Sequence, residues 1–187
     1  MAMPHSTAHW TAAEVLALPD DGNRYEVVDG ELLVSPAPSL HHQRAVGLLY
    51  ERLRPFVESH GLGCVLSSPA DIEFDERTLV QPDVFAAPLV EGRLPRSWKE
   101  VHGLLLAVEV LSPSTARADR QVKRRRYQRH GVSEYWIVDL DARLIERWRP
   151  ADERPEILGE RIEWRPSPDT PPLLIDLVAL FAEVLDH

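Results

Sequence analysis

The sequence predicts a mixed α/β fold in which a central sheet is flanked by helices, with an N-terminal β-hairpin and additional C-terminal strands. Three observations support this prediction. Pro and Gly divide the chain into short strand-like runs. A nearly continuous apolar run, Leu104–Leu111, is typical of a strand buried on both faces. Two longer stretches have helical spacing, and strands that alternate with helices are expected to form a helix-covered sheet.

Length and composition indicate one globular domain. The 187 residues, 44% of them hydrophobic, can bury a sizeable core without disulfides or metals. The single cysteine, Cys64, excludes an intramolecular disulfide framework and a cysteine-rich zinc site. We predict one domain over residues 1–187, with a core at about 20–150 and C-terminal strands and a helix at 151–187.

Charge and hydropathy limit the partners. Met1–Thr7 has no features of a signal peptide, and no apolar run approaches the ~20 residues of a membrane span, so we expect a cytoplasmic protein without a membrane partner. The net charge of −9 argues against a non-specific nucleic-acid binder. Between Arg117 and Arg129, however, seven basic residues accompany a single acid. Such a stripe either approaches a phosphate backbone or forms a solvated helix face.

The N-terminal elements have clear boundary signals. A short helix is expected at Trp10–Leu18, with Thr11 and Glu14 forming a capping box. A longer helix is expected to begin after Ser39 and to end at Gly61.

Between these helices, Asp29-Gly30 separates two strand-like runs, Arg24–Val28 and Glu31–Ser35, and is a strong hairpin signal. Glu26 and Glu31 fall on the same face of that hairpin.

The remaining elements follow from short apolar runs and turn residues. Further strands are expected at Gly63–Leu66, Ala70–Phe74, Val80–Ala86, Leu104–Leu111, Glu134–Asp139, Leu144–Trp148 and Ile157–Trp164. Residues 88–100 read as an exposed loop. Helices are expected at about Ala116–His130 and about Ile175–Leu185.

Three residues form the candidate catalytic constellation. Asp83 follows Pro82 on a predicted strand, and Glu109 is the lone carboxylate within a buried apolar run. A buried glutamate is costly unless it is paired, protonated or bound to a metal. Two carboxylates on neighbouring strands would suit Mg²⁺ or Mn²⁺, and Lys123 on the following helix would stabilise a charged phosphate. The chain has only two lysines, so a lysine within an arginine run is notable.

Several strings of the chain together resemble one family. They are Arg24–Leu32, Ser35–Pro38, His42-Gln43, Val80–Val84, Val108–Thr115, Asp119–Lys123, Tyr127, Gly131-Val132 and Glu134–Asp139. In this order, over about residues 20–150, they resemble the Uma-type restriction endonuclease family. The resemblance implies a restriction-endonuclease-like core of the PD-(D/E)XK superfamily, with Asp83 and Glu109 as ligands of Mg²⁺ or Mn²⁺.

The resemblance includes one departure from the superfamily pattern. The superfamily usually has its lysine two residues after the second acid, where this chain has Leu111. Members of the family resemble one another in moving the lysine to the following helix, which matches Lys123. The family label derives from fold, and fold does not fix function.

Further site candidates are weaker. Glu31 is favoured over Glu26 as an additional ligand by its place in the family string, although the two glutamates could simply pair with Arg24 and Arg44. His42 could line the cleft, cap the helix or be exposed to solvent. Arg120 and Arg124 are the predicted contacts to a nucleic-acid backbone.

Two hypotheses of different class follow, with a third left open. The first is a metal-dependent endonuclease that hydrolyses DNA phosphodiesters, with DNA as its partner. The second is a catalytically silent module with the nuclease fold that binds nucleic acid or protein, which the acidic net charge favours. A hydrolase of small phosphorylated molecules is the third. A two-fold homodimer would suit cleavage of two strands.

Overall fold

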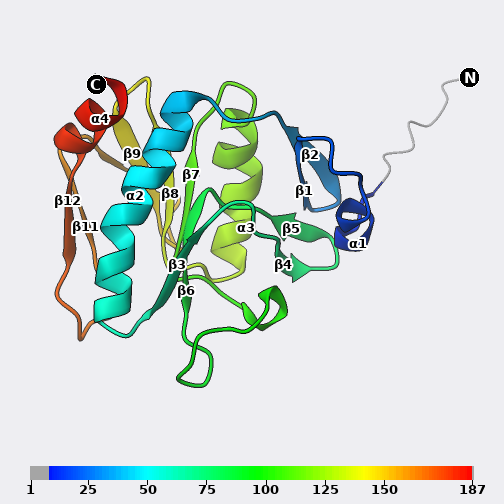
Figure 1. Ribbon diagram of the computed structural model, residues 1–187, viewed down its shortest axis with the longest axis horizontal. Helices are drawn as coiled ribbons and strands as arrows, with labels where there is room; N and C mark the ends of the chain where they lie inside the picture. Colours follow the sequence, from blue (N-terminus) through cyan, green and yellow to red (C-terminus); the bar gives the residue numbers. More distant parts are fainter. Residues whose placement is uncertain (1–8, 187) are drawn as a thin grey trace, which may run out of the picture.

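The computed structural model describes residues 9–186 and contains the predicted mixed sheet covered by helices (Figure 1). Its main sheet has six strands in the order β10-β9-β8-β7-β6-β3. Only β7 and β8 pair in parallel, and the helical segment between them makes the crossover that a parallel pair requires. A smaller sheet has the order β2-β1-β5-β4, and β11 pairs with β12.

The elements have the following bounds. The helical segments are α1 (Ala12–Leu16), α2 (Leu40–Ser59), the 3₁₀ turn η1 (Trp98–Glu100), the π-helical turn η2 (Ala118–Lys123), α3 (Arg124–Arg129) and α4 (Leu177–Leu185). The strands are β1 (Arg24–Val28), β2 (Glu31–Ser35), β3 (Gly63–Ser67), β4 (Ile72–Asp75), β5 (Thr78–Val80), β6 (Val84–Pro88), β7 (Leu106–Val110), β8 (Tyr135–Asp139), β9 (Leu144–Trp148), β10 (Glu156–Leu158), β11 (Arg161–Trp164) and β12 (Leu173–Asp176).

The main sheet is buried on both faces because its strands alternate between two apolar clusters. On one face Val108 and Val110 of β7 pack with Leu53 of α2 and with α4. On the other face Ala107 packs with Tyr127 of α3 and with residues of the small sheet. Glu109 belongs by alternation to this second face, which is why the carboxylate points towards the π turn and α3 rather than towards α2.

The predicted hairpin is confirmed residue for residue. Val28 pairs with Glu31, and the connecting Asp29 and Gly30 both have positive φ, of 57° and 82°. This is the backbone that an Asp-Gly turn provides. The capping box of Thr11 and the cap of α2 by Ser39 are also present.

Three predicted elements differ in their extent. The strand expected at Val80–Ala86 is two strands, because the chain leaves the small sheet after Val80 and enters the main sheet at Val84. Pro82 lies in this passage and has no N–H for a ladder. The strand expected at Ile157–Trp164 is likewise divided between two sheets. The last helix begins at Leu177, because the residues before it form β12 and Asp176 caps the helix.

Within residues 9–186, no helix is both long and apolar enough to cross a bilayer. Residues Met1–Thr7, on which the expectation of no signal peptide depends, lie outside the described residues. The prediction of a single domain stays a prediction.

Two glycines give opposite predictions for stability. A Cβ at Gly63 would lie 1.9 Å from the backbone oxygen of Ala87 on the paired strand β6, so Gly63→Ala must displace that strand. We expect it to lower the free energy of unfolding by more than about 2 kcal/mol. Gly47, in the middle of α2, has nothing within 4 Å of the added atom. Gly47→Ala should therefore raise the free energy of unfolding by about 0.5–1 kcal/mol. Urea unfolding of both variants measures this, and equal effects would contradict it.

Candidate active site

Asp83 and Glu109 lie beside each other because β6 and β7 are antiparallel neighbours. The pairing of Val84 with Val108 brings the residues just beyond them, Asp83 and Glu109, into register. The Oδ2 atom of Asp83 accepts a hydrogen bond of 2.8 Å from the backbone N of Val110. Both carboxylates are buried, with exposures of 2% and 1%.

Lys123 approaches these carboxylates from the π turn η2. Its Nζ donates a hydrogen bond of 3.0 Å to Oε1 of Glu109 and lies 2.7 Å from Oε2 of Glu26. A third carboxylate, Asp119, lies four residues earlier on the same turn, with its Oδ1 3.5 Å away from Nζ. The ammonium is therefore enclosed by three acids, and the lysine is only 1% exposed. π turns of this kind are often found at functional sites.

Tyr127 completes the surroundings of Glu109. Its hydroxyl donates a hydrogen bond of 3.0 Å to the same Oε1 atom that Lys123 contacts. Burial and the neighbouring Glu109 charge raise the pKa of Tyr127 well above its ordinary value, so the phenol stays a neutral donor. Oε1 is thus fixed by two donors from one helical segment.

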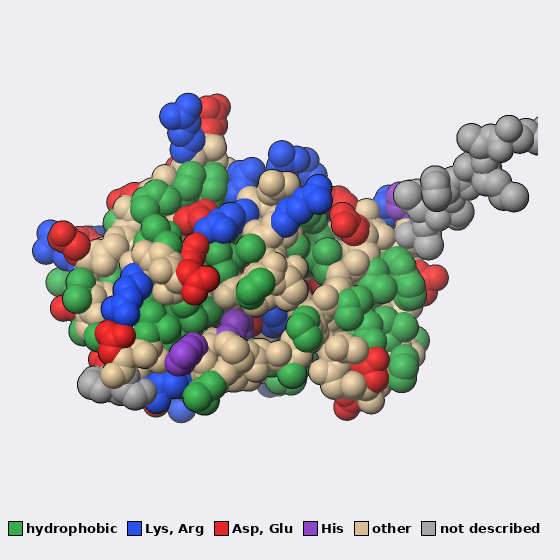
Figure 2. All heavy atoms as spheres, turned by 90° about the horizontal axis from the view of Figure 1, so that it is seen from above, with side chains coloured by type: hydrophobic (Ala, Val, Ile, Leu, Met, Phe, Trp, Pro, Cys, Tyr) green, Lys and Arg blue, Asp and Glu red, His purple; other side chains and the backbone are tan. Residues whose placement is uncertain are grey.

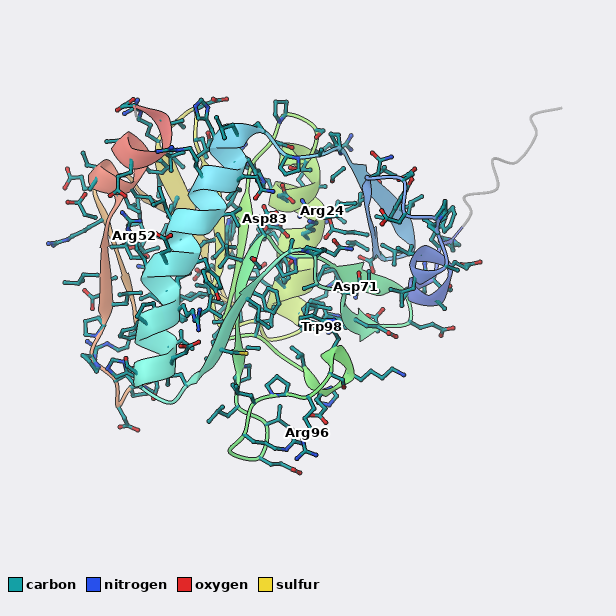
Figure 3. The ribbon with its side chains drawn as sticks, in the orientation of Figure 1. Arg24, Arg52, Asp71, Asp83, Arg96 and Trp98 are labelled. Carbon is teal, nitrogen blue, oxygen red and sulfur yellow. The ribbon has the colours of Figure 1, made fainter. Side chains whose placement is uncertain are left out.

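Asp83 is held by donors from three parts of the chain. Nη1 of Arg24, at the start of β1, donates a 2.7 Å hydrogen bond to Oδ1. Nε2 of His42, one turn into α2, lies 3.1 Å from Oδ2, which also accepts the bond from Val110 N. Figure 3 shows Arg24 and Asp83 close together, between α2 and the hairpin.

The cluster has more acids than permanent cations. Glu26, Asp83, Glu109 and Asp119 are the acids, and Arg24 and Lys123 are the cations. If all are ionised, four negative charges face two positive ones, and the difference equals the charge of one divalent cation. In addition, Glu26 Oε2 and Asp119 Oδ1 are buried and accept no hydrogen bond of suitable geometry, although both are in ion-pair contact with Lys123.

The pKa values of the acids separate accordingly. Burial would raise the pKa of Asp83, but the hydrogen bond from His42 and the charge of Arg24 outweigh burial and lower it to about 2. Burial raises the pKa of Glu109 well above its ordinary value, Lys123 opposes this shift, and the neighbouring acids add to it. Burial also raises the pKa of Asp119. For Lys123, burial favours the neutral amine, but the surrounding carboxylates outweigh it and raise the pKa, so the amine stays protonated.

A cleft of about 950 Å³ opens onto this cluster. Its walls come from the start of α2, from the loop that follows β7 and from the chain around β1 and β2. Arg24, His42 and Asp83 line it, whereas Glu109 and Lys123 are not among its lining residues and lie behind them. Figure 2 looks onto the face with the N-terminal end of α2, where histidines lie beside a hollow.

The acids fit a hard divalent cation in chemistry and number. Mg²⁺ is usually held by one or two protein carboxylates, while water and substrate phosphate supply the other oxygens. Asp83 and Glu109 are such a pair, and the unbalanced negative charge favours a cation there. Among residues 9–186, no group of three or more His, Cys, Asp or Glu side chains forms a preformed metal cage. Asp83 and Glu109 are the residues that could hold such a cation, together with oxygens from water or substrate.

Of the remaining predicted residues, His42 lies at the site and Glu31 lies outside it. His42 is in contact with Asp83. Glu31, the favoured additional acid, is exposed at the far end of the hairpin, and Glu26 takes the buried position instead. The sequence does not separate the two, because both glutamates share one hairpin face and only docking against β5 shows which end is buried. A ligand role for Glu31 stays a prediction.

The two predicted backbone-contacting arginines are engaged within the protein. Arg120 lines the cleft but pairs with Asp139 at 2.8 Å and with Glu146 at 2.6 Å. Arg124 lies over the ring of Trp148, 4.4 Å from its centroid. Their contact with nucleic acid stays a prediction.

Sequence reasoning missed three members of the site. Arg24 is considered in the sequence only as a partner for Glu26 or Glu31, and Asp119 and Tyr127 appear only as parts of the family strings. A signal for the last two exists, since Asp119, Lys123 and Tyr127 recur at intervals of four residues and so share one helix face. No comparable signal within β1 marks Arg24, because its partner Asp83 is 59 residues away.

Taken together, the sheet, its helices and the acids at its centre define a restriction-endonuclease-like α/β protein. Residues 12–178 match the model of the Uma2 family, described as "Putative restriction endonuclease", and the chain belongs to this family. A solved structure titled as a "putative nuclease belonging to DUF820" from Anabaena variabilis has the same fold. It has a TM-score of 0.74 and 19% identity, and the match covers 94% of this chain and 99% of that chain. No curated protein matches the chain.

The two lysines of the chain provide a matched test of the ion cluster. Lys123→Met leaves three buried carboxylates without their shared cation, so we expect it to lower the free energy of unfolding by about 3–5 kcal/mol. Lys99 lies exposed in η1, and Lys99→Met should change that free energy by less than about 0.5 kcal/mol. Equal small effects in urea unfolding would show that the cluster does not depend on Lys123.

Glu109 gives a prediction for pH dependence in metal-free protein. Its pKa is raised on folding, so protonated Glu109 contributes stability that is full below the ordinary pKa of 4.5 and is lost as pH rises through the raised value. Glu109→Gln has no such loss. We therefore expect the free energy of unfolding of Glu109→Gln, relative to that of wild type, to increase as the pH rises. The increase is about 1.4 kcal/mol for each pH unit between the ordinary and the raised pKa of Glu109.

Denaturant unfolding with chelator present, from about pH 4 to about pH 8, checks this expectation across the ordinary pKa of a glutamate. Glu58→Gln, at an exposed position of α2, is the control for the general effect of replacing glutamate by glutamine. A flat difference between Glu109→Gln and wild type would mean that the Glu109 pKa is not raised.

Proposed function

We propose that the protein is a metal-dependent endonuclease of the PD-(D/E)XK type that hydrolyses phosphodiester bonds of DNA. The observation that supports this most is the placement of Asp83, immediately before β6, next to Glu109 of the adjacent strand β7, with Lys123 of the following helical segment bonded to Glu109. Membership of the Uma2 family agrees with a nuclease-like function.

The relocated lysine supports the same assignment. Leu111 stands two residues after Glu109 and lines the cleft, so that position has no amine to offer. Lys123 supplies an amine to Glu109 from the π turn η2, at 3.0 Å. Because its pKa is raised, Lys123 holds its proton and does not act as a base. Lys123 instead balances the charge of Glu109 and fixes the orientation of its carboxylate towards the proposed cation site.

Asp83 and Glu109 would hold Mg²⁺ or Mn²⁺ at the inner end of the cleft. When bound, this ion would polarise the phosphodiester and lower the pKa of the attacking water. The protein positions the ligands in advance, since Asp83 is fixed by Val110 N and His42, and Glu109 by Lys123 and Tyr127. Such preorganisation lowers the cost of assembling the transition state.

One specific observation favours the second candidate function, a catalytically silent module with the nuclease fold. Asp83, Glu109 and Lys123 are each at most 2% exposed and already have partners within the protein. A module of this kind would keep the ion cluster for stability alone. The two candidates differ in whether a divalent cation enters the cluster.

Calorimetric titration of Mg²⁺ and Mn²⁺ separates them, with nicking of supercoiled plasmid measured alongside. We expect wild type to bind metal and nick DNA, and Asp83→Ala and Glu109→Ala to lose binding and to nick at least on the order of 100-fold more slowly. Glu58→Ala removes an exposed carboxylate of α2 and should match wild type. Absence of both binding and nicking in folded wild type would support the silent module.

A further inference from the structure

The two oxygens of Asp83 are held in different ways. Oδ2 accepts the backbone N–H of Val110 at 2.8 Å and lies 3.1 Å from Nε2 of His42. Oδ1 is contacted by Arg24, whose Nη1 lies 2.7 Å away. Val110 belongs to the central sheet and His42 to α2, so Oδ2 stays fixed whatever Arg24 does. Oδ1 is the oxygen that a cation entering from the cleft would have to take.

Arg24 occupies the place where such a cation would bind. Its guanidinium supplies Asp83 with the positive charge that a metal would otherwise supply, and this charge helps to keep the carboxylate ionised. Two cations at one carboxylate oxygen would repel each other strongly at low dielectric. Entry of a divalent ion at Oδ1 therefore requires that Arg24 leaves it.

The guanidinium has donors left for another partner. All three of its hydrogen bonds within residues 9–186 come from Nη1, which also contacts the backbone oxygen of Gln81 at 3.2 Å and Oγ of Ser68 at 3.4 Å. Its Nε lies 3.9 Å from Glu26, beyond hydrogen-bond distance. The planar fork of arginine suits two oxygens of one phosphate.

Arg24 also lies where a substrate phosphate would arrive. It lines the cleft together with Asp83, and its side chain is 20% exposed while that of Asp83 is 3% exposed. It is the first residue of β1, preceded by the turn at Asp21–Asn23, so its side chain can shift without breaking the hairpin ladder. Figure 3 shows Arg24 on the hairpin side of Asp83.

We propose that Arg24 exchanges partners: it pairs with Asp83 Oδ1 in the metal-free protein and with the substrate phosphate when a divalent cation takes that oxygen. Metal and phosphate would then strengthen each other's binding, because each removes a competitor of the other. This inference rests on the proposed metal-dependent function and assigns Arg24 as the residue that couples the two ligands. It is a positioning residue for the metal and a binding residue for the phosphate.

Titration of Mn²⁺ by calorimetry tests the exchange on the whole protein, with and without inorganic phosphate. Arg24→Gln removes the competing charge, so we expect it to bind Mn²⁺ at least about fivefold more tightly than wild type when phosphate is absent. Phosphate should raise the Mn²⁺ affinity of wild type by about fivefold or more beyond the increase it causes in Arg24→Gln, where phosphate and metal are coupled only through shared coordination.

Arg52→Gln is the matched control, because Arg52 forms an equally close carboxylate pair with Glu183 on the side of α2 away from Asp83 (Figure 3). It should behave as wild type in both titrations. The double variant Arg24→Gln, Asp83→Ala should lose Mn²⁺ binding, which would show that the titrated Mn²⁺ binds at Asp83.

Two results would overturn the exchange in different ways. Equal Mn²⁺ affinity in wild type and Arg24→Gln, with binding lost in Asp83→Ala, removes the role of Arg24 and leaves the proposed function intact. Absence of Mn²⁺ binding in every folded variant would overturn both the exchange and the proposed function.

If Arg24→Gln does not fold, Arg24→Lys is the alternative variant. It keeps the competing positive charge but lacks the two-pronged guanidinium, so a Mn²⁺ affinity near that of wild type, without the additional phosphate effect, supports the exchange. An intact phosphate effect in Arg24→Lys contradicts it.

Discussion

The ammonium of Lys123 organises the centre of the molecule, since carboxylates from three separate elements converge on it. Glu26 comes from the small sheet, Glu109 from the main sheet, and Asp119 from the π turn that also carries the lysine. Each acid alone would destabilise an apolar core by several kcal/mol. Together with the lysine they connect the two sheets, so the same contacts that allow the fold to close also place the candidate catalytic groups.

Much of this arrangement could be predicted because its signals are local. The hairpin is specified by Asp29-Gly30, and Glu109 is conspicuous as the one carboxylate in a run of buried hydrophobes. Lys123 is marked by the scarcity of lysine, and its 1% exposure agrees with a special role. Asp29-Gly30 is required by the turn, whereas Glu109 and Lys123 differ in type from the residues around them, so all three signals can be seen within a short stretch of sequence.

The remainder depends on how distant segments meet, which no local pattern records. The run Val80–Ala86 reads as one strand because apolar residues stand on both sides of Gln81–Asp83, yet its two ends belong to different sheets. Glu26 and Glu31 are equivalent until the hairpin docks, and docking buries the first. The arginines of the basic stripe read as free charges, whereas Arg120 is neutralised by acids of β8 and β9.

The single parallel pair, β7 with β8, has a consequence for the order in which the protein can be completed. A parallel neighbour is reached only through a crossover, and here the crossover is the segment that contains Lys123. Until β8 has docked beside β7, that segment lacks the anchor at its C-terminal end and is held by side-chain contacts such as those with Glu26 and Glu109. A nascent chain that ends before β8 would thus contain every charged residue of the site but would lack the strand that ends the crossover.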